Sequence, residues 1–261
     1  MTSRALRIRY VPLVRTGGRT WAVGVVVAAA VLSGCTTTVI GTATSAGSGT
    51  ASSAAHASGR PATAAPDAAQ LDRVGLQLAD LPAGWSAGDD GGPDEEIMRS
   101  VAGCLGARDA WTDVAVVGHA SGFVDGSDDE IGSFAASYRS QRDVDDDAAL
   151  LRDPRASACF GHAFDDSVGR TAVPGGASIG AADFTVVAGS GGGPSNLAGF
   201  GLGTLPVTTV SGQRTAIYVQ FLLITGRMTE VQLFFLSIGA PLPAGLRADA
   251  VAAVARRAAA L

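Results

Sequence analysis

Three cysteines have the clearest potential for covalent chemistry in this 261-residue chain. Cys35 closes the run Leu32-Ser33-Gly34-Cys35, which follows an arginine-rich segment and an apolar run. That apolar run has about 12 residues, fewer than the roughly 20 that a membrane-spanning helix needs. This order is typical of a bacterial lipoprotein signal, whose cysteine receives a diacylglycerol before cleavage. We therefore expect a signal peptide over 1–34 and a lipid on Cys35, the alternative being an ordinary secretory signal with a chance cysteine.

The other two cysteines, Cys104 and Cys159, form an even pair in a protein that we expect to be exported. Such pairs most often form a disulfide. Closing a loop of about 56 residues would stabilise the folded state by roughly 4 kcal/mol. The alternatives are free thiols or a zinc site, because Cys159 and His162 have C-x-x-H spacing and His119 could complete the ligand set.

One serine motif and two glycine-rich segments match catalytic loops only in part. Gly176-Ala177-Ser178-Ile179-Gly180 matches G-x-S-x-G, but a hydrolase serine of this type needs a preceding strand, a following helix and a later histidine. Every histidine of the chain precedes Ser178. The glycine-rich segments 189–194 and 199–203 lack the lysine of a phosphate-binding loop. We expect them to form one long loop between strands, which could act as a lid.

The acidic residues do not follow a metal-binding pattern. The aspartates of 143–147 fall in the first turn of a predicted helix, where negative charge is favourable. They lack the alternation and the central glycine of an EF-hand loop, and the acidic turn at 125–130 has the same ambiguity. Catalysis by Asp183, His119 or His162 would need a clustered partner that the sequence does not reveal. We therefore expect a protein that is not an enzyme and that uses no metal or cofactor.

Hydrophobic periodicity predicts five helices in the folded domain. The first is expected to begin at Asp67, because Asp67 and Gln70 have the spacing of a capping box. Leu71, Val74, Leu78 and Leu81 then follow at helical intervals, and Pro82 ends the pattern. The other helices are predicted at 95–105, 143–151, 155–164 and after Pro243.

Runs rich in β-branched and aromatic residues predict strands at 114–124, 131–138, 184–188, 207–210, 215–225 and 229–238. Glu230 and Gln232 alternate with apolar residues, which predicts that one face of the first half of the last strand is exposed to solvent. The strand at 215–225 is apolar on both faces, which suits a central strand covered by helices. This order of elements predicts an α+β fold, a single antiparallel sheet packed with helices.

Composition distinguishes a flexible tether from the folded domain, and the charge of the chain disfavours nucleic acid as a partner. Residues 35–66 are mostly Ala, Ser, Thr and Gly and cannot bury enough apolar surface to fold. We expect one domain over 67–261. The net charge of −5, with every cation an arginine, and a pI of about 5.1 disfavour nucleic-acid binding. The expected partners are the membrane, through the lipid, and a small apolar ligand or an envelope protein.

Several short motifs run through the domain: Leu78-Ala79-Asp80-Leu81-Pro82-Ala83-Gly84-Trp85, Cys104-Leu105-Gly106, Ser121-Gly122-Phe123, Ser137-Tyr138 and a helical Cys159. Together they resemble actinobacterial cell-envelope lipoproteins. More loosely, 67–261 is similar to the extracellular sensor domain of mycobacterial PknH-type serine/threonine kinases. That sensor domain resembles a two-disulfide domain, whereas this chain has cysteines for one. The resemblance implies an α+β sensor-like or carrier-like domain with a large cleft, and it transfers no catalytic residue.

These observations lead to two hypotheses for a lipid-anchored protein on the extracytoplasmic face of the cell membrane. The first is a non-enzymatic binding or sensor-like module for a small apolar or amphiphilic envelope molecule, held in a groove beside the sheet. Tyr218 and Leu222, on one face of the strand at 215–225, are the residues that we expect to line that groove. The alternative is a protein–protein interaction module of the cell envelope without a small ligand. Helices filling the space beside Tyr218 and Leu222 would favour this alternative.

Overall fold

The computed structural model describes residues 65–88, 95–127, 129–169, 177–189, 193–194 and 196–261. The lipidation site expected at Cys35 and the expected tether lie outside these residues. No helix in the described ranges combines the length and the apolar character needed to cross a bilayer.

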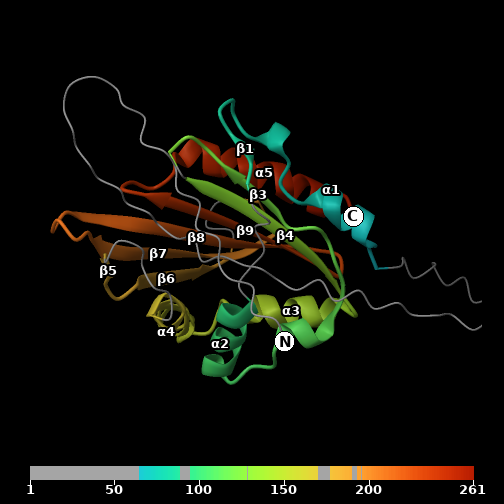
Figure 1. Cartoon of the computed structure of the whole chain (residues 1–261). Coiled ribbons are helices and arrows are strands. Elements are labelled where there is room, and N and C mark those ends of the chain that lie inside the picture. Colours follow the sequence, from blue (N-terminus) through green and yellow to red (C-terminus); the bar gives the residue numbers. More distant parts are fainter. Residues whose placement is uncertain (1–64, 89–94, 128, 170–176, 190–192, 195) are drawn as a thin grey trace, which may run out of the picture.

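A single antiparallel sheet forms the centre of the described domain (Figure 1). Its strand order is β1-β3-β4-β9-β8-β7-β5, with β2 also pairing with β4 and β6 also pairing with β7. The strands are β1 (Ser86–Ala87), β2 (Val114–Val117), β3 (Ser121–Val124), β4 (Glu130–Tyr138), β5 (Ser178–Ile179), β6 (Asp183–Ala188), β7 (Leu197–Thr208), β8 (Arg214–Gly226) and β9 (Thr229–Ile238). The α+β fold predicted from the sequence is therefore confirmed.

Helices cover both faces of this sheet (Figure 1). One face carries α1 and α5, and the other carries α2, α3 and α4. The α-helices are α1 (Ala68–Val74), α2 (Glu95–Leu105), α3 (Gln141–Leu150), α4 (Ala156–Gly169) and α5 (Ala244–Ala259). Two 3₁₀ turns, η1 (Leu78–Asp80) and η2 (Ala110–Asp113), complete the regular structure of the described ranges.

Alternation along the central strands divides the apolar side chains between two cores, because successive residues of a strand point to opposite faces. Leu222 and Ile224 of β8 pack in the core beneath α1 and α5, together with Leu233 of β9. Phe221 and Leu223 point to the other face and pack against α2 and α4. The sheet therefore separates two apolar layers, each completed by its own helices.

The first helix begins as predicted but ends earlier. The backbone N–H of Gln70 donates to Asp67 Oδ1, and the backbone N–H of Asp67 donates to Gln70 Oε1, each at 2.9 Å. The helix stops at Val74 because the chain then turns to the sheet, where the Leu76 N–H donates to Ser133 Oγ at 2.7 Å. Leu78, predicted on the apolar face of this helix, is instead 45% exposed in η1.

The glycine-rich segment 199–203 is part of β7 and not of a loop, so the lid expected from it is wrong for these residues. It pairs with β6 on one side and with β8 on the other. A Cβ atom at Gly201 would lie 2.1 Å from Phe221 Cε1, and one at Gly203 would lie 2.6 Å from Phe184 Cδ2. Glycine is needed here because aromatic rings lie directly against the strand.

The strand predicted at 114–124 is divided into two. β2 and β3 both pair with β4, and the chain between them turns at 118–120. Gly118 packs tightly at this turn, where an added Cβ would lie 2.8 Å from Leu71 Cβ. The break thus brings α1 close to the sheet.

Candidate functional site

A small cavity lies between the sheet and the layer formed by α2, α3, α4 and η2. Its volume is about 30 Å³. This is room for about two water-sized groups, since one water needs roughly 10–15 Å³ on this measure. Most of the lining is apolar, and the polar part is contributed by Asp109, Tyr138, Asp147, Glu230 and Gln232.

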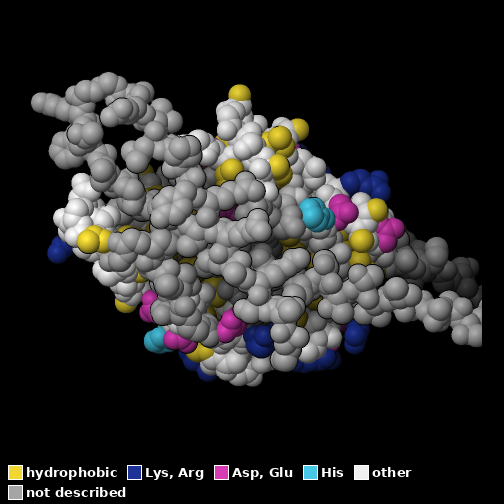
Figure 2. Space-filling view, in the orientation of Figure 1, with side chains coloured by type: hydrophobic (Ala, Val, Ile, Leu, Met, Phe, Trp, Pro, Cys, Tyr) yellow, Lys and Arg dark blue, Asp and Glu magenta, His cyan; other side chains and the backbone are white. Residues whose placement is uncertain are grey.

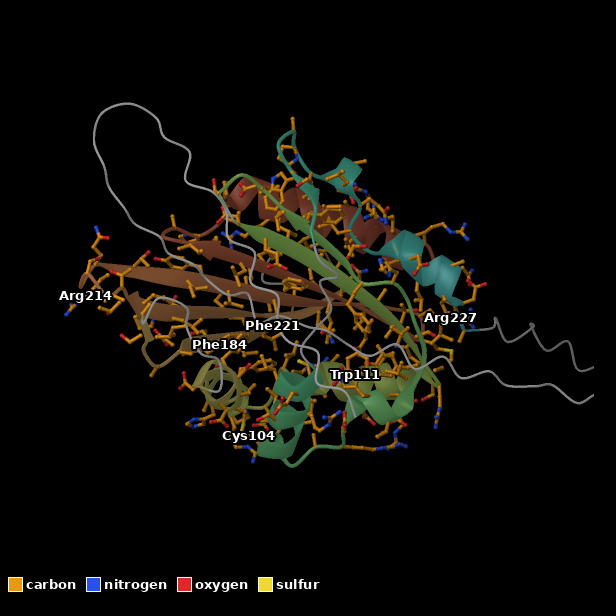
Figure 3. The ribbon with its side chains drawn as sticks, viewed as in Figure 1. Cys104, Trp111, Phe184, Arg214, Phe221 and Arg227 are labelled. Carbon is orange, nitrogen blue, oxygen red and sulfur yellow. A yellow bond between two sulfur atoms is a disulfide. The ribbon has the colours of Figure 1, made fainter. Side chains whose placement is uncertain are left out.

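Aromatic rings form much of the wall. Phe160 of α4 stacks on Phe221 of β8 with ring centroids 4.5 Å apart, and Phe184 of β6 continues the stack. Trp111 of η2 packs against Phe134 of β4 at 5.2 Å. In Figure 3, Phe184 and Phe221 point from the sheet toward the helices, and Trp111 lies beside α3. The two aromatic groups thus contribute to the lining from different elements.

Three acidic groups meet at one end of this cavity. The Tyr138 hydroxyl donates to Glu230 Oε2 at 2.8 Å. The Asp147 carboxyl is in hydrogen-bonding contact with both Glu230 and Tyr138. Glu230 is only 1% exposed, and its Oε1 has no conventional donor among the described groups. Two carboxyl groups in contact can form a hydrogen bond only while one of them carries a proton.

Burial and mutual proximity favour the protonated forms of these groups. Burial raises the pKa of Glu230 well above its ordinary value, and the neighbouring Asp147 adds to this effect. Burial also raises the pKa of Asp147, although its hydrogen bonds with Glu230 and Tyr138 act in the opposite direction. The pKa of Tyr138 is raised by burial and by the two adjacent carboxyls. Burial and the contact between the two carboxyls thus both favour one proton shared by Asp147 and Glu230.

Hydrogen bonds at the start of α3 and the strand pairing of β9 hold Asp147 against Glu230. The α3 helix begins after Ser140, whose Oγ accepts from the Asp143 N–H at 3.3 Å. The Met228 N–H of the β8–β9 turn donates to Gln141 Oε1 at 2.9 Å, which ties the start of α3 to the hairpin carrying Glu230. One helical turn and a half later, Asp147 faces the sheet. Glu230 itself is paired with β4 and β8 on its two sides, so neither partner is on a loop.

The disulfide between Cys104 and Cys159 joins the two helices that cover part of the cavity. Its Cα atoms are 5.7 Å apart, and it links α2 to α4. Cavity-lining residues stand beside both cysteines in sequence, Val101 and Ala102 on α2 and Phe160 on α4. Figure 3 labels Cys104 in the helical layer below the sheet. The Cys104–Cys159 pairing predicted from the sequence is present in the structure.

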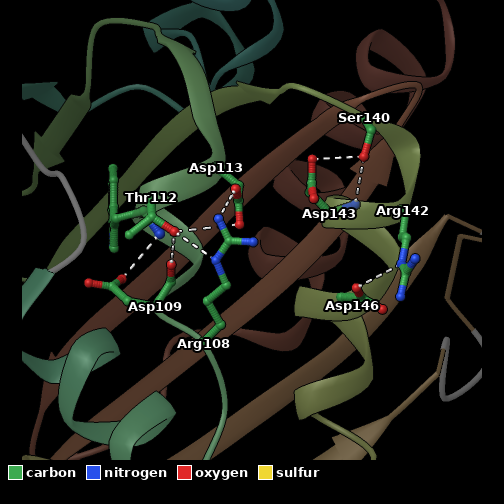
Figure 4. A network of polar contacts seen from close by, with 9 residues as sticks. Arg108, Asp109, Thr112, Asp113, Ser140, Arg142, Asp143 and Asp146 are labelled. Carbon is green, nitrogen blue, oxygen red and sulfur yellow. Dashed lines mark hydrogen bonds and ion pairs between the residues drawn. The ribbon is translucent and has the colours of Figure 1, made fainter.

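A polar network positions Trp111 at the cavity wall (Figure 4). The Trp111 N–H donates to Asp109 Oδ1 at 3.1 Å, which caps η2. The Thr112 hydroxyl donates to the Asp109 carbonyl at 2.8 Å, and Arg108 reaches Thr112 and Asp113. Because these bonds fix the short η2 turn, they also fix the ring that packs on Phe134.

The predicted groove residues lie on the opposite face of the sheet from this cavity. Leu222 is 4% exposed and packs in the core beneath α5, so a helix fills the space beside it. Tyr218 is half-buried on the same face of β8. The lining residues from β8 are instead Phe221 and Leu223. A helix therefore lies where the groove was expected beside Leu222, which is the outcome that favours the protein–protein interaction alternative, and the cavity lies on the other face of β8.

The sequence does not reveal that Glu230 is buried, because its alternation with apolar residues is typical of a strand with one solvent-exposed face. That prediction is wrong, since α3 covers this part of β9. The sequence prediction also places Asp147 with the aspartates of the first helical turn and does not single it out. A signal was present, because Val144, Asp147, Ala148 and Leu151 share helical spacing, which puts an acid in an apolar stripe. The three residues considered for catalysis, His119, His162 and Asp183, are exposed and do not line the cavity.

Metal binding and surface charge do not define a second site. In the described part of the chain, no group of three or more His, Cys, Asp or Glu side chains could hold a metal ion. Figure 2 shows described acidic and basic side chains interspersed along the edge where α2, α3 and α4 lie. Two comparisons with known proteins were negative: no family model matches the chain, and no curated protein matches it.

Proposed function

We propose that this protein is a lipid-anchored, extracytoplasmic binding module that holds part of a small, largely apolar molecule in the cavity beneath α2, α3 and α4. The single observation that carries this proposal is an aromatic-walled cavity whose lining includes the buried carboxyl group of Glu230. Small-molecule sites are mostly apolar and have a few polar groups that orient the ligand. The membrane anchor rests on the signal sequence and Cys35.

The volume of the cavity restricts what can enter. A site for a whole organic ligand typically measures roughly 300–1,000 Å³. About 30 Å³ accepts only one end of such a molecule. Met98 of α2 and Leu150 of α3 are half-buried lining residues, and methionine adapts readily to irregular spaces. A larger ligand body would therefore require these side chains to move.

Native mass spectrometry of the full chain, purified in detergent from the membranes of its own cell, tests the proposal. We expect a small molecule to remain bound and to be released on denaturation. Ala136 lines the cavity, so Ala136→Leu should reduce the bound fraction, and Ala102→Leu provides a second filling variant from α2. Ala115→Leu, at an exposed position of β2, is the matched control and should retain the ligand.

Two results would contradict the proposal. The first is a protein that carries no small molecule and binds none when cell-envelope extracts are added. The second is a ligand retained equally by both filling variants. An empty protein would favour the alternative of an envelope protein–protein interaction module, and crosslinking in intact cells would then identify its partner.

A further inference from the structure

We propose that the polar end of the ligand is a primary ammonium group, which binds between Asp147 and Glu230 in place of the proton that they share. This inference rests on the proposed function and names the chemistry of its ligand. It follows from the groups that line the cavity and from the protonation that their geometry requires.

The cavity has acidic groups but no basic counter-ion. Its titratable lining residues are Asp109, which caps η2, Tyr138 of β4, Asp147 of α3 and Glu230 of β9. No arginine or histidine is among the lining residues, and the chain has no lysine. Arg99, which is not among the lining residues, pairs with Asp109 at 3.2 Å. A cation inside the cavity would therefore meet an excess of acceptors.

The aromatic wall favours an organic cation over a hydrated metal ion. Rings attract cations through their negative faces, and this attraction strengthens when the site is desolvated. Phe134, Phe160 and Phe221 line the same cavity as the carboxyls. Calcium, by contrast, requires six to eight oxygen ligands. An ammonium group needs only three acceptors. The Asp147 and Glu230 carboxyls have four oxygens, and one of them accepts from Tyr138.

Size points to an unbranched primary amine. The cavity holds about two water-sized groups, which matches an ammonium nitrogen and the first carbon attached to it. A quaternary ammonium ion is larger and cannot donate the hydrogen bonds that the carboxyl oxygens accept. Methylammonium and ethylammonium are therefore suitable probes, and tetramethylammonium is an informative negative one.

The exchange balances charge and protons. Before binding, the Asp147–Glu230 pair holds one proton, and the pair has one negative charge. When the ammonium enters, the shared proton leaves to solvent and the second carboxyl becomes ionised. The complex of two carboxylates and one cation then has the same net charge as the empty site. Binding must therefore release about one proton per ligand where the pair is protonated in the free protein.

Isothermal titration calorimetry of the full chain with ethylammonium chloride tests both features. The ionic strength is kept constant with sodium chloride, and the titration is repeated in buffers with different ionisation enthalpies. We expect saturable binding with release of about one proton. Ethanol, acetate and tetramethylammonium, tested at the same concentrations, should bind at least tenfold more weakly.

Variants test whether ethylammonium binding depends on the Asp147–Glu230 pair itself or only on the overall negative charge of the protein. Glu230→Gln keeps the shape and can satisfy Tyr138 and Asp147 as a neutral partner, so it should fold but lose at least tenfold in ethylammonium affinity. Asp147→Asn is a second variant with the same expectation. Asp145→Asn, an exposed change on the same helix, is the matched control and should bind as the wild type does. Circular dichroism checks that each variant is folded.

The outcomes distinguish this inference from the function on which it rests. Equal affinity for ethanol and ethylammonium, binding without proton release, or unchanged binding by Glu230→Gln would each overturn the ammonium assignment. If native mass spectrometry still finds a neutral ligand displaced by Ala136→Leu, the binding function stands and only its ligand chemistry changes. If neither amines nor native ligands bind, both proposals fail.

Discussion

At the scale of single residues, Glu230 is an acid held in the interior by neighbours that are themselves acids. Tyr138 donates to one of its oxygens and Asp147 contacts it from α3. A second buried negative charge beside the first is costly, so one proton shared by the two carboxyls is favoured. The protonation of this pair therefore connects the stability of the protein to pH.

The first prediction concerns this connection. Burial raises the pKa of Glu230 in the folded state, so the folded protein binds more protons than the unfolded chain between the ordinary pKa and the folded value. The stabilisation is complete below the ordinary pKa of about 4.5 and is lost as pH rises through the folded value. Each pH unit over which the two states differ by one proton costs about 1.4 kcal/mol.

Glu230→Gln should remove most of that dependence. The wild-type melting temperature should fall between pH 5 and pH 8, by about 3–6 °C for each pH unit in which one extra proton is bound. The variant should show a flatter profile and equal or exceed the wild type at pH 8. Thermal unfolding followed by circular dichroism measures this, with Asp145→Asn as control. Parallel profiles for wild type and Glu230→Gln would show that the pair does not hold the proton.

A second residue-scale prediction concerns Asp80 and Arg257, which join η1 to the end of α5. Arg257 Nη1 and Nη2 donate to the two Asp80 oxygens at 3.1 and 2.7 Å, and Nη2 also donates to the Gly75 carbonyl at 2.8 Å. Burial acts to raise the pKa of Asp80, but the bonds from Arg257 and the Gln77 N–H outweigh it, so the pKa is lowered. The ion pair therefore stabilises the fold above the ordinary pKa of 3.8.

Asp80→Asn should lower the free energy of unfolding by about 1–3 kcal/mol at pH 7. The difference from the wild type should shrink as pH falls below about 3.8, because Asp80 then becomes protonated in the wild type also. Urea unfolding at pH 7 and pH 3 measures both effects. Asp249→Asn, an exposed change on α5, is the control. A pH-independent difference would mean that the carboxylate charge contributes nothing.

At the scale of elements, β7 carries glycines where a strand usually has β-branched residues. The third prediction follows from the ring contacts of Gly201. Gly201→Val should destabilise the protein by about 1–3 kcal/mol through overpacking, although valine is the better strand former. Leu202→Val changes the exposed face of the same strand and should have little effect. Urea unfolding of the two variants measures this, and a stabilised Gly201→Val would contradict the packing argument.

How far the sequence predicts these elements depends on whether the signal is local. The capping box at Asp67, the helix at 95–105 and the strands at 131–138 and 229–238 were predictable, since capping and periodicity are local. The strand at 199–203 was not, because its glycines are explained only by Phe184 and Phe221 lying against them. The carboxyl pair was half-predictable: an apolar stripe surrounds Asp147, but only the tertiary packing of α3 buries Glu230.

At the scale of the whole molecule, the sheet divides the domain into two layers that are stabilised differently. The layer beneath α1 and α5 is held by apolar packing and by the Asp80–Arg257 ion pair. The layer with α2, α3 and α4 contains the cavity, the buried acids and the disulfide. Cavities and buried polar groups weaken a core, whereas a covalent link between its helices restricts the unfolded chain.

The last prediction is therefore that loss of the disulfide affects one layer first. The double variant Cys104→Ser and Cys159→Ser should lower stability by up to about 4 kcal/mol in the chain-entropy account. Hydrogen exchange should show faster amide exchange in α2 and α4, while α5 and the strands paired with β9 keep their protection. The wild type carries the link as a control, observed as a mass about 2 Da below the reduced form. Equal loss of protection in α5 would mean that the two layers unfold as one unit, and the cavity roof would then have no independent freedom to admit a ligand.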